Sequence, residues 1–254
     1  MVFYFTATGN SLYAAKKFSD EPISIPQIIH SDDLVFEDDS IGIVFPVYCN
    51  MPPSIVTDFL NKAVFKTKYF YAILTYGNRH SGAAEYTRRI AEDAGIKLDY
   101  ACNILMVDNY LPVFDMNEQK SIDKNVEAQL DAAVADVKAR RKYIPPITDE
   151  EEKHHEELMA MNEKVPQFNS GEQLIIKDGC TGCGICQKVC PIGNIEVKEN
   201  RAERKSAKCL FCLACIQNCP HKAIGLTMAD KNPEARYRNE HISLSEIIES
   251  NNQI

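Results

Sequence analysis

Eight cysteines in the C-terminal part of the 254-residue chain carry the clearest chemistry in the sequence. Three cysteines in x2 steps precede a fourth, which follows after x3 and is followed by proline, and the arrangement occurs twice: Cys180, Cys183, Cys186, Cys190 and Cys209, Cys212, Cys215, Cys219. Clustered thiolates suit zinc or iron–sulfur centres. Zinc sites usually show two C-x2-C pairs separated by a longer stretch, and disulfide frameworks are typical of small secreted chains. The spacing therefore favours iron–sulfur centres.

This repeat resembles that of bacterial ferredoxins with two [4Fe–4S] clusters. Corresponding cysteines of the two copies are 29 residues apart, as a pseudo-twofold ferredoxin requires. In such ferredoxins the fourth cysteine of each copy binds the other cluster. The resemblance implies a first cluster set, Cys180, Cys183, Cys186 and Cys219, and a second cluster set, Cys209, Cys212, Cys215 and Cys190.

A second candidate site lies at the other end of the chain, in the loop formed by residues 6–11. An apolar segment, residues 2–5, reads as a buried strand, and residues 12–18 read as a helix. Backbone N–H groups between a strand and a helix can bind an anion, and the helix dipole favours its charge. The loop has neither the G-K-[ST] ending of a Walker loop nor dinucleotide-binding glycines. An ordinary turn with an N-cap remains the alternative.

The 6–11 loop also resembles the phosphate loop of flavodoxins, whose pattern is T/S-x-T-G-x-T/S. That resemblance implies binding of the terminal phosphate of FMN, largely without a cation. The residues it assigns to the phosphate are Thr6, Ala7, Thr8, Gly9, Asn10 and Ser11.

The segments that follow alternate between strand and helix, as in a doubly wound sheet. Further strands are expected at residues 23–25, 41–47, 69–75 and within 96–107. Helices are expected at residues 54–64 and 83–94, and a long helix is expected to carry the apolar stripe from Ile122 to Val137. We predict a flavodoxin-like α/β domain over residues 1–144, with a five-stranded parallel sheet in the order 2-1-3-4-5.

Ligands of such sheets bind beyond the carboxyl ends of the strands. Two of the predicted strands are followed by an aromatic residue there, and flavodoxins commonly place the flavin ring between aromatics of these loops. By resemblance, Tyr48 and Tyr76 are the candidates, with Gly77 and Asn78 at the ring edge. The chain lacks the tryptophan found in the first of these loops in well-known flavodoxins. A packing role for either tyrosine stays open, as does a flavin contact from the loop at residues 108–112.

The remaining chain divides into three predicted parts. Residues 145–170 read as a linker, with a helix across the two domains as one interpretation. Its charged run includes His154 and His155, for which a solvated helix face is favoured over a paired-histidine metal site. Residues 171–228 form a small α+β two-cluster ferredoxin domain with few apolar residues, so its clusters must supply much of its stability. Residues 229–254 form a tail, in which a Ser243–Glu246 capping box predicts a short helix packed back on the body.

Bulk properties exclude some classes of function. The chain has 28 Lys plus Arg against 36 Asp plus Glu, and no basic run suggests nucleic-acid binding. No apolar stretch is long enough to span a bilayer, and the apolar first residues lack the basic flank of a signal peptide. Thiolate ligands favour a reducing compartment, so the cytoplasm is expected.

The whole chain resembles fusions of a flavodoxin with a two-cluster ferredoxin, which implies two [4Fe–4S] clusters and FMN as cofactors. The favoured function is electron transfer that couples one- and two-electron steps for redox partner proteins. The alternative is a flavin-dependent reductase of a small substrate, so whether the chain is an enzyme stays open. A cluster-donating scaffold is a third idea. No catalytic acid, base or nucleophile is identified in the sequence.

Overall fold

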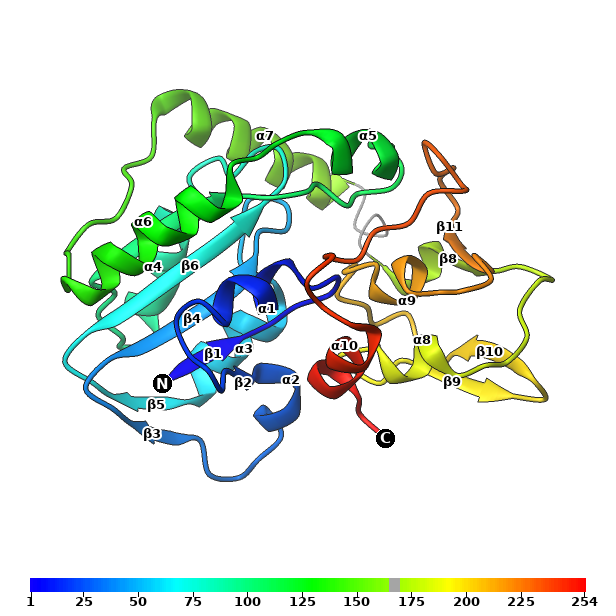
Figure 1. Ribbon diagram of the computed structural model, residues 1–254, viewed down its shortest axis with the longest axis horizontal. Coiled ribbons are helices and arrows are strands. Elements are labelled where there is room, and N and C mark those ends of the chain that lie inside the picture. The colour runs from blue at the N-terminus through cyan, green and yellow to red at the C-terminus, as the bar shows by residue number, and fades with distance from the viewer. Residues whose placement is uncertain (165–169) are drawn as a thin grey trace.

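The computed structural model describes residues 1–164 and 170–254; part of the predicted linker, residues 165–169, lies outside the described residues. A parallel sheet forms the N-terminal domain (Figure 1). Its strands run in the order β2 (Ile23–Ser24), β1 (Val2–Tyr4), β4 (Ile41–Pro46), β6 (Phe70–Tyr76) and β7 (Tyr100–Leu105). Numbered among themselves, these strands have the order 2-1-3-4-5, which confirms the predicted topology.

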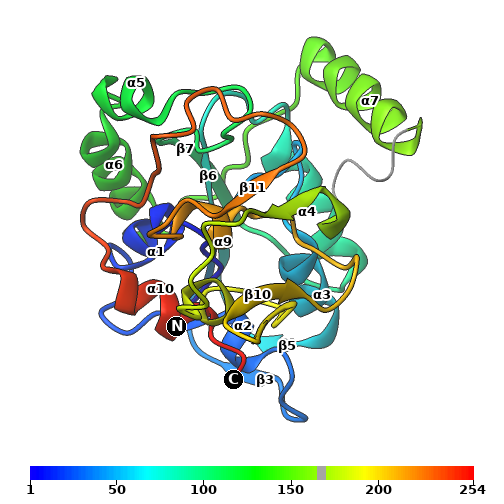
Figure 2. The ribbon, with the colours of Figure 1, turned by 90° about the vertical axis from the view of Figure 1, so that its right-hand side faces the viewer.

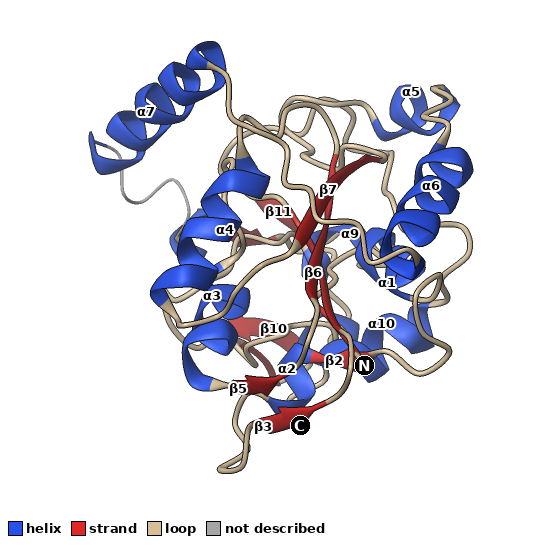
Figure 3. Cartoon of the chain, turned by 90° about the vertical axis from the view of Figure 1, so that its left-hand side faces the viewer, coloured by secondary structure: helices blue, strands red, loops and turns tan. Residues whose placement is uncertain are grey.

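Helices cover both faces of this sheet (Figure 3). One face carries α1 (Asn10–Ala15) and α6 (Val126–Lys138), and the other carries α3 (Ser54–Lys62) and α4 (Ala83–Asp93). Strands β4 and β6 are therefore apolar and buried along almost their whole length, as strands covered on both faces should be. The short α2 (Ile25–Ile28) starts with a proline in its first turn.

Two local expectations were wrong. The helix at residues 54–64 ends at Lys62, because Val64–Lys66 forms a strand, β5, that pairs in parallel with β3 (Val35–Glu37). The predicted long helix is divided into α5 (Met116–Ser121) and α6, and Ile122 is 48% exposed between them. The cause of this break is local: Asn125 has φ 51° and its N–H is bonded to the Asp123 carboxylate.

The C-terminal cysteine-rich domain is built from two similar halves (Figure 2). The antiparallel pairs are β8 (Leu174–Ile176) with β11 (Ile224–Leu226), and β9 (Ile195–Lys198) with β10 (Arg201–Arg204). Each half also contains one turn of helix, α8 (Ile185–Lys188) or α9 (Ala214–Gln217), and a 3₁₀ turn (Gly171–Gln173) precedes β8. This is the small α+β architecture expected from the sequence.

Two further segments pack on these domains. Helix α7 (Asp149–Lys164) lies beside the N-terminal domain, and α10 (Leu244–Asn251) lies between α2 and α8 (Figure 1). The capping box of α10 is present, with Ile242 and Ile247 buried, so the predicted terminal helix is confirmed. Across residues 1–164 and 170–254, the helices include none with the length and apolar character needed to cross a bilayer.

Candidate cofactor sites

The two cluster sets are gathered as the crossed assignment expects. Cys219 joins Cys180, Cys183 and Cys186 around one hollow, and Cys190 joins Cys209, Cys212 and Cys215 around another. The thiols surround these hollows rather than converge on a point, and in the described part of the chain no three His, Cys, Asp or Glu side chains are placed to hold a single ion.

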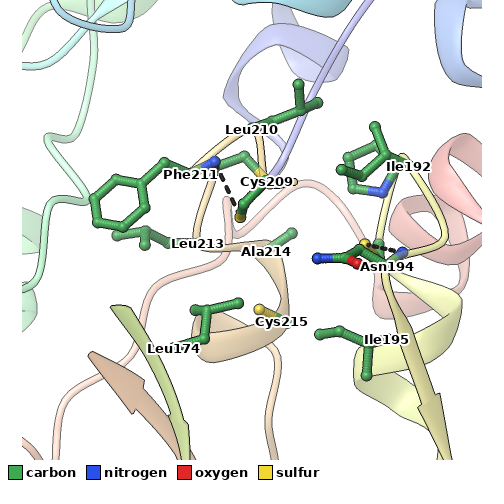
Figure 4. Close-up of a pocket in the computed structure, with 13 residues that line it drawn as sticks. Leu174, Ile192, Asn194, Ile195, Cys209, Leu210, Phe211, Leu213, Ala214 and Cys215 are labelled. Carbon is green, nitrogen blue, oxygen red and sulfur yellow. Dashed lines mark hydrogen bonds between the residues drawn. The ribbon is translucent and has the colours of Figure 1, made fainter. Parts of the chain in front are cut away.

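Backbone N–H groups point at several of these sulfurs. The amide of Asn194 donates to Cys190 Sγ at 3.2 Å, and the amide of Ala223 donates to Cys219 Sγ at 3.3 Å. These two bonds are equivalent in the two halves. In the second set, Phe211 N also donates to Cys209 Sγ at 3.3 Å (Figure 4). Such bonds favour thiolate over thiol and tune the potential of a cluster bound there.

Burial differs between the two sets. Cys183 of the first set is exposed, whereas Cys212 and Cys215 of the second are buried. Burial first, and then the neighbouring thiols, raise the pKa of Cys215 well above its ordinary value. Several buried thiolates in such a place need positively charged partners. The chemistry of the donor set therefore fits iron.

The 6–11 loop joins β1 to α1 and is buried along its whole length. Gly9 N donates to Thr6 Oγ1 at 3.1 Å, and Ser11 Oγ is bonded to Thr75 Oγ1 at 2.8 Å. No hydrogen bond within the described chain uses the backbone N–H of four loop residues: Ala7, Thr8, Asn10 and Ser11. Buried N–H groups almost always have an acceptor, so these orphans fit an anionic ligand such as the phosphate of FMN.

A cavity of about 1020 Å³ lies beside this loop. All the residues assigned by resemblance to FMN line it except Gly9: Thr6, Ala7, Thr8, Asn10, Ser11, Tyr48, Tyr76, Gly77 and Asn78. Gly9 instead faces the C-terminal tail, with φ 103°, and a Cβ there would come within 2.9 Å of the Asn239 Cβ. The structure thus brings nine predicted contacts together and places the tenth on the far side of the loop.

A tight turn places Tyr48 at the cavity, and the end of β6 places Tyr76 there. Tyr48 and Met51 exchange two backbone hydrogen bonds of 2.9 Å, with Cys49 and Asn50 in the left-handed region between them. Tyr76 ends β6, and its ring lies edge-on to His80 at 5.0 Å between centroids. Both tyrosines are half-buried, so each retains ring surface for a ligand. Asp108, after β7, also lines the cavity, and burial raises the pKa of its carboxyl.

The cavity and the hollow of the second cluster set share one wall. The same five residues line both: Cys209, Leu210, Phe211, Cys212 and Leu213. In Figure 4 the Phe211 ring extends away from the cysteines. Tyr48 lies close to this wall, since the Cys212 and Cys209 thiols, after burial, contribute to the raised pKa of its phenol. Within the described residues, no cysteine of the first set lines the cavity.

Sequence reasoning missed two other contributors. Helix α7 supplies His154, Leu158, Met161 and Asn162 to the cavity wall. His155 is 8% exposed and stacks on Tyr86 at 3.8 Å, so the expectation of a solvated histidine pair was wrong. The tail residues Tyr237 and Asn239 bind the 6–11 loop. Leu158 and Met161, three residues apart near the end of α7, were the available signal for its docking; the contacts of Tyr237 and Asn239 had none.

Residues 173–220 match the family described as the 4Fe-4S dicluster domain. This match covers both cysteine repeats, and the strand order of the preceding domain is that of flavodoxins. The chain thus joins a domain with the flavodoxin strand order to a 4Fe-4S dicluster domain.

Curated relatives resemble the ferredoxin part of this fusion. A component of an ion-translocating oxidoreductase complex from Methanosarcina acetivorans is 52% identical over 54 residues, which are 21% of this chain and 20% of the relative. A ferredoxin from Pyrobaculum islandicum is 36% identical over 67 residues, which are 26% of this chain and 62% of the relative. The fusion therefore spans only part of the length of these relatives. Among solved structures, a candidate flavoprotein from Bacteroides uniformis is 19% identical over 41% of this chain and 88% of its own, with a TM-score of 0.34, too low to establish a shared fold.

Proposed function

We propose that this protein transfers electrons between two [4Fe–4S] clusters and an FMN on behalf of redox partner proteins. The observation that carries the proposal is the wall shared by the second cluster set and the cavity that the 6–11 loop borders. When bound, the clusters would each exchange one electron and FMN one or two, so the fusion could couple single-electron and paired-electron steps.

The positions of the two cluster sets support an order of electron transfer. Cys209 and Cys212 of the second set line the cavity directly, whereas among the described residues no cysteine of the first set does, and Cys183 of the first set is exposed. The first set is thus the side at which partner proteins would exchange electrons. Named relatives with ferredoxin and oxidoreductase-complex descriptions support an electron-transfer role.

Anaerobic purification with assays for iron, sulfide and FMN tests the cofactors. Two [4Fe–4S] clusters contain about eight iron atoms and about eight sulfide ions per chain. The 6–11 loop should bind about one FMN per chain. Cys183→Ala and Cys209→Ala should each lose about half of the iron, whereas Cys102→Ala, in β7, should lose none. A protein that holds iron but never binds FMN would refute the proposed electron transfer between the clusters and FMN.

The same variants test the order. With a ferredoxin-type donor, Cys209→Ala should stop flavin reduction, because the first cluster would be isolated from the cavity. Cys183→Ala should slow oxidation of the donor. When the remaining cluster of this variant is reduced chemically, however, its electrons should still pass to the flavin. The reverse pattern would show that the first set is the nearer one.

A second candidate function, reduction of a small substrate, is favoured by the size of the cavity. Its volume is at the top of the range of about 300–1,000 Å³ for ligand pockets. The α7 wall brings His154 to it, with Nδ1 bonded to Ser81 Oγ at 2.8 Å. Steady-state turnover of small acceptors, compared with electron passage to protein partners, would separate the two functions.

A further inference from the structure

Gln217 connects the ferredoxin domain to both segments that hold the 6–11 loop. It lies in α9, two residues after Cys215 of the second cluster set, and is 4% exposed. Its Nε2 donates to the Asn109 carbonyl at 2.7 Å, and its Oε1 accepts the Tyr237 N–H at 2.8 Å. One side chain thus forms hydrogen bonds with a backbone carbonyl in the loop after β7 and with a backbone N–H in the C-terminal tail.

Each of these two contacts leads to the 6–11 loop through a single residue. Asn109 donates its Nδ2 to Thr8 Oγ1 at 2.6 Å. Tyr237 donates its hydroxyl to Asn10 Oδ1 at 2.6 Å. Two separate chains of hydrogen bonds therefore connect α9, which carries Cys215 of the second cluster set, to the 6–11 loop.

The tail also binds the outer side of the loop. Asn239 N donates to the Thr8 carbonyl at 2.8 Å, and Asn251 Nδ2 donates to the Thr6 carbonyl at 2.9 Å. These bonds occupy acceptors of the loop, while its orphan N–H groups belong to residues that line the cavity. The tail is therefore placed to hold the loop with its donors directed at an anion.

We propose that Gln217 is a positioning residue that couples the second cluster to FMN binding. Helix α9 is a single turn whose folding depends on the metal held by Cys215, because metal binding is coupled to folding in such small domains. While α9 is folded, Gln217 keeps Asn109 and Tyr237 against the loop. Coupling between sites is reciprocal, so FMN should in turn help the second set retain its cluster. This inference rests on the proposed function, because it requires FMN at the 6–11 loop.

The experiment measures affinities for FMN and riboflavin in the full-length, cluster-loaded protein by flavin fluorescence. Gln217→Leu leaves the Asn109 and Tyr237 backbone groups without partners, and should weaken FMN binding about tenfold. Riboflavin lacks the phosphate, so its affinity should change less than about twofold. Iron content should match the wild type. Equal FMN affinities in variant and wild type would overturn the coupling, whereas a wild type that binds no FMN would overturn the proposed function itself.

Asn218 offers a matched control. It is the next residue, it is 6% exposed, and its Nδ2 donates within its own helix to the Ala214 carbonyl at 3.0 Å. Asn218→Ala removes a buried hydrogen bond from α9 without touching either chain of hydrogen bonds. FMN affinity should therefore stay at the wild-type value. A loss equal to that of Gln217→Leu would show that any destabilisation of α9 weakens FMN binding, and this would contradict a specific role of the Gln217 contacts.

A milder variant keeps the test valid if Gln217→Leu fails to fold. Tyr237→Phe removes only the hydroxyl that binds Asn10, and should weaken FMN binding several-fold with riboflavin unaffected. The reciprocal measurement follows iron release to a chelator. Saturating FMN should slow release in the wild type and have little effect in Gln217→Leu. Equal release rates with and without FMN in the wild type would overturn the coupling.

Discussion

Gly77 lies so close to Asp108 that a Cβ on the glycine would come within 2.3 Å of the Asp108 Cα. This contact sets the separation of the loops after β6 and β7 at the cavity. Gly77→Ala should push these loops apart, destabilise the protein by about 1–3 kcal/mol through overpacking, and weaken FMN binding. Urea unfolding and flavin fluorescence measure the two effects. Gly179→Ala, where an added Cβ would meet nothing within 4 Å, is the control, and identical behaviour of the two variants would contradict this reading.

The capping box of α10 should stabilise the tail. Ser243 Oγ accepts the Glu246 N–H, and the Glu246 carboxylate accepts the Ser243 N–H at 2.7 Å. Ser243→Ala should cost about 1 kcal/mol, because the helix loses its N-cap acceptor. Ser243→Asn retains an acceptor and should behave like the wild type. Equal unfolding midpoints for Ser243→Ala and the wild type would show that α10 does not contribute to global stability.

Docking of α7 should weaken in acid because of His155. Burial first, and then Arg89, lower its pKa, while Glu156 and Glu152 oppose them. The undocked state therefore binds a proton more readily, so docking is favoured at pH values above the ordinary histidine pKa of about 6.5 and is lost progressively as the pH falls below it. Hydrogen exchange of α7 amides between pH 7.5 and 5 should show this loss.

His155→Phe preserves a ring against Tyr86 without a titrating group, so it should flatten the pH dependence of α7 exchange. His30→Gln, at an exposed position, should leave that dependence unchanged. If His155→Phe keeps the full acid response, another group must be responsible for it.

Removal of iron should unfold the ferredoxin domain locally. Its strands are three or four residues long and its own buried core is small, including Ile195, Ile216 and Ile224. Without metal these elements cannot offset the entropy of ordering the chain. After chelation, amides of residues 171–228 should lose exchange protection and the far-UV CD signal should fall, while β4 and β6 stay protected. Unchanged protection of residues 171–228 would contradict this prediction.

Several features could be read from the sequence because local rules determine them. The x2 spacing places three thiols within seven consecutive residues, so the cysteine repeat predicts its chemistry without long-range information. The buried strands β4 and β6 are apolar along their length, which predicts a sheet covered on both faces. The Ser243–Glu246 pair predicts its own helix start. Where a local rule competed with another, as at Ile122 and Val64, the helix boundary was misjudged.

The sequence by itself therefore determined the two kinds of domain, the repeated cysteine spacing and the position of the 6–11 loop. Only the tertiary structure decided which cluster set lies beside the cavity, that α7 borders it, and that the tail covers the loop. Tyr237 and Asn10 are 227 residues apart along the chain. Such a contact leaves no periodic or spacing signal, because it arises from packing between folded elements.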